Sequence, residues 1–212
     1  MDFHHFLDLV PDLISAPLGG LESQLKMVPK ERPLFNEKEL LKRLPKEASV
    51  LALFYPNSLG KTSFLLTLRA SYQGVHAAQI SFPGGKKEPG DKTFAETALR
   101  EANEEIGVNP TDIKLLRKIS NTYIPPSNFL VHSYVGILAY EPEFRLNHEV
   151  EQIIEVKLSD LLDSRTLKTK RLTTSYMNDV QVPYYDLNNH TVWGATAMIL
   201  SEIKDLIKVV NS

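Results

Sequence analysis

Cysteine is absent from this chain of 212 residues. Its absence excludes disulfides, thiolate metal sites and cysteine nucleophiles, and it fits a reducing compartment. A surplus of basic residues is also missing, because 24 Lys and Arg stand against 26 Asp and Glu, for a formal net charge of -2. Without positive charge to neutralise a phosphate backbone, we do not expect nucleic acid to be the main partner.

Long apolar runs are missing too. No run approaches the roughly 20 residues that a membrane-spanning helix requires, so no membrane partner is expected. The first residues, Met1 to His5, lack the basic stretch and apolar run of a secretory signal. Residues Val210–Ser212 match no retention or peroxisomal signal. We therefore expect a cytoplasmic protein, and its 42% of hydrophobic residues is ordinary for a globular core.

Residues 1–45 predict an N-terminal helical leader packed on a domain that spans residues 46–212. Apolar side chains recur at helical spacing near its start, at Phe3, Phe6, Leu7, Val10, Leu13 and Ile14. Pro17, Gly19 and Gly20 interrupt that helix, and Pro45 ends a second one expected at Glu37–Leu44. We expect the helices to cap the domain. The alternatives are a contact in a homodimer or a part of the substrate wall.

From Ala48 onward, the pattern predicts strands mixed with helices. The expected strands are Ser49–Tyr55, Thr62–Ala70, Gln79–Phe82, Ile113–Thr122, Phe129–Tyr140, Val150–Val156, Asp179–Asp186 and His190–Trp193. The expected helices are Thr93–Ile106, Leu158–Leu162 and Ala195–Val210. Because strands and helices do not alternate strictly, an α/β fold with a mixed sheet covered by helices is favoured over a doubly wound parallel sheet.

The helix expected at Thr93–Ile106 carries three acidic residues within two turns. Glu101 and Glu105 are four residues apart on one face, and Glu104 lies beside them. The opposite face is apolar, with Phe94, Ala95, Ala98, Leu99, Ala102 and Ile106. Like charges repel, and the C-terminal end of a helix disfavours anions, so helix stability does not explain this cluster. A hard divalent cation explains it, because magnesium binds oxygen ligands and shares its shell with substrate phosphates.

Two glycines precede this helix. Gly84 and Gly85 allow a tight backbone turn, and a main-chain carbonyl there can complete the shell of the ion. Arg100 can pair with Glu104 at i, i+4 and hold one carboxylate in place. Taken alone, these residues also fit a solvated acidic helix face that follows an ordinary turn.

The segment from Arg100 to Val108 reads Arg-Glu-Ala-Asn-Glu-Glu-Ile-Gly-Val. It resembles the helical half of the Nudix box, which is Arg-Glu-apolar-x-Glu-Glu-x-Gly-apolar, at every position. Five fixed letters match by chance on the order of once in a million starting points. One departure lies upstream, where Lys92 stands at the position of the commonest Glu. Asp91 looks like its substitute after a one-residue insertion.

Resemblance to the Nudix hydrolase superfamily implies an α/β/α sandwich with a mixed β-sheet and a catalytic loop–helix–loop. It implies Mg²⁺-dependent hydrolysis of a phosphoanhydride bond, with Mn²⁺ as the alternative ion. The implied metal ligands are Glu101, Glu104, Glu105 and Gly85. The implied catalytic residues are Glu101, Glu104 and Arg100. Whether Glu104 orients Arg100, binds a second metal or acts as the base stays open.

Other segments look like the coenzyme A diphosphatase branch of that superfamily. They are Leu66–Ala70, His76, Phe82–Gly85, Tyr123–Ser127 and Val192–Ala197, and the likeness covers roughly residues 48 to 205. The chain departs from the branch at Gly74, which is usually an Arg, and at Ala78, which is usually a Gly. An Arg would suit the 3′-phosphate of coenzyme A, because it forks phosphate oxygens well.

The branch implies a small-molecule nucleoside diphosphate derivative as substrate, namely coenzyme A or an acyl form. Its cleavage gives 3′,5′-ADP and phosphopantetheine or acyl-phosphopantetheine. The candidate substrate-binding residues are Arg69, Lys86, His76 and Tyr123. Phe129 is a candidate for either the site wall or the core, and Trp193 is expected to pack the last helix.

A general base outside the box is a further expectation, with Glu149, Glu151 and Glu155 as the candidates. Two other functions stay open. In the first, the enzyme cleaves another nucleoside diphosphate-linked substrate, such as ADP-ribose or a dinucleotide cofactor. In the second, the domain is a catalytically inactive nucleotide-binding module.

Overall fold

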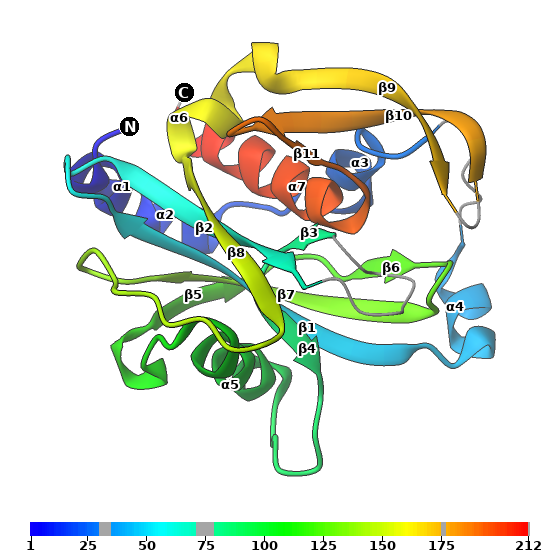
Figure 1. The fold of residues 1–212 in the computed structure, drawn as a ribbon, viewed down its shortest axis with the longest axis horizontal. Helices are drawn as coiled ribbons and strands as arrows, with labels where there is room; N and C mark the ends of the chain where they lie inside the picture. Colours follow the sequence, from blue (N-terminus) through cyan, green and yellow to red (C-terminus); the bar gives the residue numbers. More distant parts are fainter. Residues whose placement is uncertain (30–34, 71–78, 175–176, 212) are drawn as a thin grey trace.

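A mixed β-sheet lies at the centre of the computed structural model, which describes residues 1–29, 35–70, 79–174 and 177–211 (Figure 1). Within those ranges the sheet has eight strands. They are β1 (Lys46–Pro56), β2 (Thr62–Arg69), β3 (Ile80–Ser81), β4 (Gly84–Lys86), β5 (Lys114–Lys118), β6 (Thr122–Ile124), β7 (Phe129–Ile137) and β8 (Val150–Lys157). The sheet is mixed because β1 and β7 run parallel, whereas the other pairs are antiparallel.

Strand β1 organises the sheet. On one edge it pairs with β7, where Phe54 lies opposite Ile137. Two strands share its other edge: β4 pairs with the first half, with Val50 opposite Gly84, and β2 pairs with the second half, with Phe54 opposite Phe64. The pairing partner along this edge of β1 changes from β4 to β2, so the ends of β2 and β4 lie close together. Residues of both strands line one cavity.

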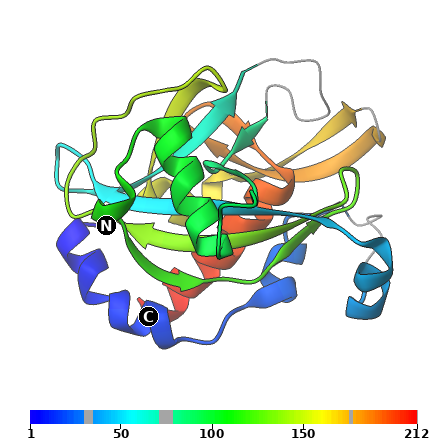
Figure 2. The same ribbon diagram turned by 90° about the horizontal axis from the view of Figure 1, so that it is seen from below.

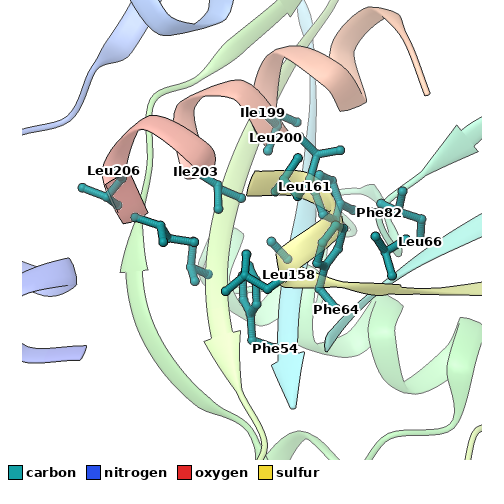
Figure 3. Packing of buried hydrophobic residues seen from close by; sticks show 14 of the residues in the cluster. Phe54, Phe64, Leu66, Phe82, Leu158, Leu161, Ile199, Leu200, Ile203 and Leu206 are labelled. Carbon is teal, nitrogen blue, oxygen red and sulfur yellow. The ribbon is translucent and has the colours of Figure 1, made fainter. Parts of the chain in front are cut away.

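Helices cover both faces of this sheet (Figures 1 and 2). Helix α5 (Phe94–Ile106) lies on one face, where its Ala98 and Ala102 share a buried cluster with Leu51 and Leu53 of β1. On the other face, Phe54 of β1 packs in a second cluster with helices α1 (Phe3–Asp8), α2 (Val10–Ser15), α6 (Leu158–Leu162) and α7 (Gly194–Val210) (Figure 3). Successive residues of β1 thus enter opposite cores, as the pleat of a strand requires.

A smaller antiparallel sheet lies beside α7. It consists of β9 (Leu167–Thr174), β10 (Met177–Leu187) and β11 (His190–Val192), in the order β11-β10-β9. Tyr185 and Leu187 of β10 and Val192 of β11 are buried in the same cluster as Ile199 of α7. The remaining helices are α3 (Gly20–Leu25), α4 (Glu37–Arg43) and the short 3-10 turns Pro110–Asp112 and Ser164–Thr166.

The first 29 residues pack against the sheet and α7. The backbone N–H of Phe3 donates to the Gly60 carbonyl at 3.0 Å, and Phe6 is fully buried. Buried Glu202 of α7 accepts hydrogen bonds from the backbone N–H groups of Gly20 (3.2 Å) and Ser120 (3.3 Å). Its carboxylate also accepts one from the Gln24 side chain at 2.9 Å. The division of the chain at residue 45 stays a prediction.

Most of the expected elements are confirmed, and so is the mixed sheet between helices. The expected single strand Ile113–Thr122 is wrong: it is split into β5 and β6, with a register shift between Leu115 and Arg117. Strand β9 and helix α3 were not anticipated. Among the helices of the described residues, none is long and apolar enough to cross a membrane.

Candidate active site

Helix α5 begins and ends at residues suited to those positions. Thr93 caps its start, since the Thr93 hydroxyl accepts a hydrogen bond from the Glu96 N–H at 3.1 Å. Gly107 ends it with a φ of 74°, a left-handed conformation that glycine adopts without strain. Glu101, Glu104 and Glu105 therefore occupy the last two turns of a well-defined helix.

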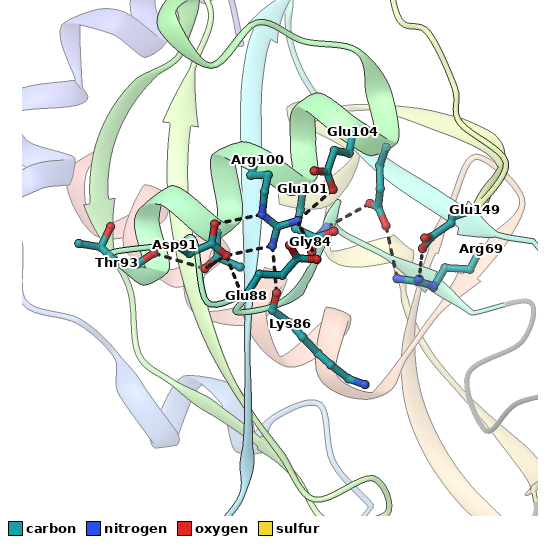
Figure 4. Close-up of polar contacts among 12 residues, drawn as sticks. Arg69, Gly84, Lys86, Glu88, Asp91, Thr93, Arg100, Glu101, Glu104 and Glu149 are labelled. Carbon is teal, nitrogen blue, oxygen red and sulfur yellow. Dashed lines mark hydrogen bonds and ion pairs between the residues drawn. The ribbon is translucent and has the colours of Figure 1, made fainter.

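Arg100 forms the hub of the polar cluster in front of α5 (Figure 4). Its Nε and Nη2 donate to the two carboxylate oxygens of Asp91, each at 3.0 Å. Nη1 pairs with Glu101 at 3.0 Å and with Glu104 at 2.9 Å, and Nη2 also donates to the Lys86 carbonyl at 3.0 Å. The pair with Glu104 that the i, i+4 spacing predicted is present. One guanidinium thus ties the loop before α5 to two of the three helix carboxylates.

Asp91 holds Arg100 in this position. It is buried and also accepts hydrogen bonds from the Glu88 N–H at 2.9 Å and from the Thr97 hydroxyl at 3.0 Å. The hydrogen bonds from Arg100 hold the pKa of Asp91 well below its usual range, although burial opposes them. The carboxylate is therefore ionised at neutral pH and fixes the Arg100 side chain, a role that the sequence left open.

Glu101 lies directly against the backbone of β4. A Cβ atom placed on Gly85 would overlap the Glu101 carboxylate, so a larger residue there would displace that carboxylate. The Glu101 side chain is 14% exposed, and burial raises the pKa of its carboxyl, with Arg100 acting in the opposite direction. Gly85 and Glu101, which were predicted from separate parts of the sequence, are brought into contact.

Glu105 is the most buried of the three helix carboxylates, with a side chain that is 2% exposed. It accepts a hydrogen bond from the Gly84 N–H at 3.1 Å and pairs with Arg69 Nη1 at 3.4 Å. Burial raises the pKa of Glu105 to about 7, while Arg69 and the Gly84 N–H lower it. The expectation that all three carboxylates lie opposite the apolar face is wrong for Glu105, which lies among the buried residues.

Arg69, at the end of β2, links Glu105 to a fourth carboxylate. Its Nη2 donates to Glu149 at 3.0 Å, and Glu149 directly precedes β8 (Figure 4). Glu149 is the only one of the three candidate bases that lines the cavity in the described part of the chain. Glu151 is exposed on β8, and Glu155 accepts a hydrogen bond from the Tyr55 hydroxyl at 2.8 Å.

A cavity of about 1020 Å³ opens next to these residues. Glu101, Glu104, Glu149, Arg69 and Lys86 line it on one side. Residues that follow α3 and residues of β1, β3, β6, β7, β10, β11 and α7 form most of the remaining wall, and most of their lining side chains are apolar. Such a combination of a large, mostly apolar cavity with a few convergent polar groups is typical of a ligand site.

Three of the four predicted substrate-binding residues line the cavity, and the fourth lies outside the described residues. Arg69, Lys86 and Tyr123 line the cavity. The side chain of Lys86 extends away from the carboxylates, and its Nζ lies 5.8 Å from the centre of the Phe129 ring (Figure 4). The Tyr123 hydroxyl donates to Asn128 at 2.9 Å. His76, Gly74 and Ala78 lie outside the described residues.

Several lining residues were not anticipated. Trp193 was expected only to pack the last helix, yet it lines the cavity, as do Met27, Val180 and Val182. Apolar and polar residues alternate at this point of β10, which predicts that Val180 and Val182 share one face of the strand. Gln181 between them is exposed on the other face. The sequence did not indicate which structure that face would meet.

The donor groups fit a hard divalent cation. All the acidic groups are oxygen donors, as Mg²⁺ prefers, and the Glu101 carboxylate occupies the place that a Cβ atom on Gly85 would fill. Arg100 and Arg69 offset only part of their negative charge. Across the described ranges, no three His, Asp or Glu side chains surround a common point closely enough to enclose an ion. The assignment of Glu101, Glu104, Glu105 and Gly85 as ligands therefore stays a prediction.

Comparison with known protein families gives a match to the NUDIX domain over residues 45–176. Among curated proteins, the chain is 32% identical over 157 residues to an uncharacterized Nudix hydrolase, NudL, of Photorhabdus laumondii, covering 70% of this chain and 79% of that protein. It is 30% identical over 149 residues to the Yersinia pestis protein of the same name, covering 69% and 73%.

Solved structures with the same fold include a Nudix hydrolase from M. smegmatis, RenU. It is 14% identical, with a TM-score of 0.55, and the match covers 86% of this chain and 94% of that one. A MutT/nudix family protein from Enterococcus faecalis is 16% identical, with a TM-score of 0.52 and coverage of 84% and 66%. At these identities the likeness shows the fold alone.

Proposed function

The chain belongs to the NUDIX domain family and is a Nudix hydrolase, and from this premise we propose that it cleaves the diphosphate of coenzyme A and its acyl derivatives. The products are 3′,5′-ADP and phosphopantetheine or its acyl form. Proteins of this family generally use divalent metal ions, and we propose Mg²⁺ here, with Mn²⁺ as the alternative. Coenzyme A is proposed because four of the five segments that resemble that branch, all except Val192–Ala197, lie within the matched residues 45–176.

One observation carries the proposal. The acidic cluster of α5 borders a cavity of about 1020 Å³ that is far larger and more apolar than a diphosphate alone requires. A diphosphate has negative oxygens for the cation and for Arg69 or Lys86. The remaining wall suits the organic groups on either side of the diphosphate, one of which in coenzyme A is a long arm.

Water attacks one phosphorus atom in line, and the oxygen that bridges the two phosphorus atoms leaves with the other phosphate. When bound, the ion neutralises diphosphate oxygens and lowers the pKa of a bound water. Arg100 is a positioning residue, because it fixes Glu101 and Glu104 relative to the β4 backbone. Glu104, which is half exposed on the cavity wall and paired with Arg100, would accept the proton that the attacking water releases.

The direct test is a substrate panel. Coenzyme A, ADP-ribose and reduced nicotinamide dinucleotide are each incubated with the full chain, with Mg²⁺ and with a chelator. We expect magnesium-dependent release of 3′,5′-ADP from coenzyme A at a kcat/KM at least tenfold above the other two. Preferential cleavage of ADP-ribose or the dinucleotide would contradict the coenzyme A assignment and leave the hydrolase assignment intact.

A pair of variants tests the carboxylates. Glu149→Gln removes a cavity-lining carboxylate, whereas Glu151→Gln changes an exposed carboxylate two residues away that does not line the cavity. If Glu149 reaches the site, the first variant lowers kcat at least tenfold and the second stays within twofold of the native chain. Equal activity of both variants would exclude Glu149 from the reaction and leave Glu104 as the base.

A further inference from the structure

A buried carboxylate at the middle of α7 lies apart from the acidic residues of α5. Glu202 is 0% exposed, and the residues that follow it on the helix include the buried apolar Ile203 and Leu206. Burial of a carboxylate is costly unless its oxygens receive hydrogen bonds. Replacing buried ionic groups by apolar side chains of similar volume often leaves a protein as stable or more so. Packing of α7 alone therefore does not explain why a carboxylate is found here.

The two oxygens of this carboxylate accept hydrogen bonds from two separate segments. Glu202 Oε1 accepts from the backbone N–H groups of Gly20 at 3.2 Å and Ser120 at 3.3 Å. Oε2 accepts from the side-chain amide of Gln24, which is 1% exposed, at 2.9 Å. Gly20 and Gln24 belong to α3, and Ser120 lies between β5 and β6. Because hydrogen bonds are directional, they fix these segments relative to α7 more narrowly than apolar contacts do.

Each of the joined segments continues into the wall of the cavity. The Met27 N–H donates to the Gln24 carbonyl at 3.1 Å, and Met27 is 1% exposed and lines the cavity. Tyr123 of β6 also lines it, three residues after Ser120. On α7, Ile199 lines it and lies three residues before the carboxylate, on a neighbouring position of the helix surface. In all three segments, a wall residue lies within three residues of this hydrogen-bonded cluster.

The cluster also joins parts of the chain that differ in their relation to the family. Ser120 and Tyr123 lie within residues 45–176, the segment that matches the NUDIX domain, whereas α3 and α7 lie outside it. The acidic residues of the site lie in the matched segment as well. A ligand held at those residues must fit a wall that is partly built by α3 and α7. The position of these helices relative to the matched segment therefore affects how well the ligand fits.

We propose that Glu202 is a positioning residue that fixes the Met27, Tyr123 and Ile199 parts of the cavity wall and thereby sets the affinity for substrate. It acts through its hydrogen bonds and does not touch the substrate. The inference rests on the proposed hydrolysis in this cavity, but it holds for any diphosphate substrate that binds there. A displaced wall weakens binding of the substrate and of the transition state equally, so KM rises while kcat is unchanged.

A matched pair of variants tests this role. Glu202→Ala removes the acceptor of α3 and of the loop before β6. Arg117→Met is the control, because Arg117 donates to the carbonyls of Leu13 and Ala16 at 2.6 and 2.8 Å. These three residues are all described, and none of them lines the cavity. Both substitutions thus cut hydrogen bonds that hold the first 29 residues, but only the first reaches the wall.

Steady-state kinetics with Mg²⁺ and coenzyme A are measured on the full chain, at a temperature where circular dichroism shows both variants to be folded. Glu202→Ala is expected to raise KM at least fivefold and to keep kcat within twofold of the native chain. Arg117→Met is expected to keep both KM and kcat within twofold. A loss of stability alone would lower the amount of folded enzyme and hence the apparent kcat, without a change in KM.

A second measurement does not depend on activity. Trp193 is the single Trp of the chain and lines the cavity. Its fluorescence is quenched with acrylamide in the substrate-free protein, and a loosened wall gives the quencher better access. The quenching constant is expected to rise by at least half in Glu202→Ala and to stay at the native value in Arg117→Met.

Gln24→Leu provides a milder variant in case Glu202→Ala does not fold. It removes the hydrogen bond from α3 to Glu202 Oε2 and keeps the two backbone N–H groups on Oε1. Met27 then loses its link to the carboxylate, while Ser120 keeps its own. KM is expected to rise at least twofold with kcat unchanged.

The outcomes separate this inference from the proposed substrate. Native KM and native quenching in the Glu202 and Gln24 variants would overturn the positioning role, and so would equal changes in Arg117→Met. A lower kcat with an unchanged KM would also overturn it. If the native chain turns over ADP-ribose or a dinucleotide instead of coenzyme A, the coenzyme A assignment fails. The same KM comparison, made with the substrate that is cleaved, and the quenching of Trp193 then still decide the role of Glu202.

Discussion

Replacing Glu105 by Gln should abolish turnover and at the same time stabilise the metal-free protein at neutral and alkaline pH. Glu105 is 2% exposed, and burial raises the pKa of its carboxyl from 4.5 to about 7 against the lowering effect of Arg69 and the Gly84 N–H. The folded protein therefore favours the neutral carboxyl. Gln is neutral at every pH and keeps an oxygen that can accept the hydrogen bond from Gly84.

The magnitude follows from proton linkage. A pKa that is higher in the folded state contributes stability below the unfolded value of 4.5, and this contribution is lost as the pH rises through about 7. Such a rise of the pKa corresponds to about 3 kcal/mol in full, most of which is lost between pH 5 and pH 8. Glu105→Gln removes this loss, so the difference in unfolding free energy between variant and native chain should grow by that amount over the range.

Urea unfolding, followed by circular dichroism in the presence of a chelator, measures both proteins at pH 5 and pH 8. The comparison isolates Glu105, because every other titrating group is common to the two chains. Addition of Mg²⁺ should then stabilise the native chain and leave the variant unchanged. A difference between variant and native chain that is the same at both pH values would refute the burial argument. Full activity of the variant would refute the metal assignment.

Three further predictions concern the surroundings of the site. Gly85→Ala should lower kcat at least tenfold, because the added Cβ displaces the Glu101 carboxylate. Gly90→Ala should leave kcat unchanged, because a Cβ there meets nothing within 4 Å. Equal kcat values in the two variants would contradict the close contact between Gly85 and Glu101. Asp91→Asn should lower the unfolding free energy by about 2 kcal/mol at pH 7, since Arg100 loses its paired carboxylate. Because the pKa of Asp91 is lowered in the folded protein, the difference in unfolding free energy between the native chain and Asp91→Asn should shrink as the pH falls below 3.8. Urea titrations measure this difference, and a value that does not change with pH would exclude the loss of the Asp91 carboxylate charge as its cause. Glu202→Ala should cost on the order of 3 kcal/mol, measured by urea unfolding, because three buried or half-buried donors lose their acceptor; a loss under about 1 kcal/mol would contradict that role.

Much of the fold could be predicted from local patterns. The helix at α5 and its end at Gly107 follow from apolar spacing and a glycine that accepts a positive φ. The hairpin of β1 and β2 follows from two apolar runs around a turn. The split between β5 and β6 did not follow, because a register shift against β7 depends on the partner strand and not on the residues of the shifted strand.

By itself, the sequence determined the type of chemistry at this site. Three carboxylates lie within two helical turns, and a glycine pair precedes them. These features depend only on neighbouring residues, so they do not change with the way in which the helix packs. The tertiary structure alone decided how each carboxylate is held. It buried Glu105 against Gly84, placed Arg69 between Glu105 and Glu149, and brought Met27 into the wall of the same cavity. Burial and contacts between distant segments depend on how the layers pack, and a pattern of neighbouring residues does not predict that packing.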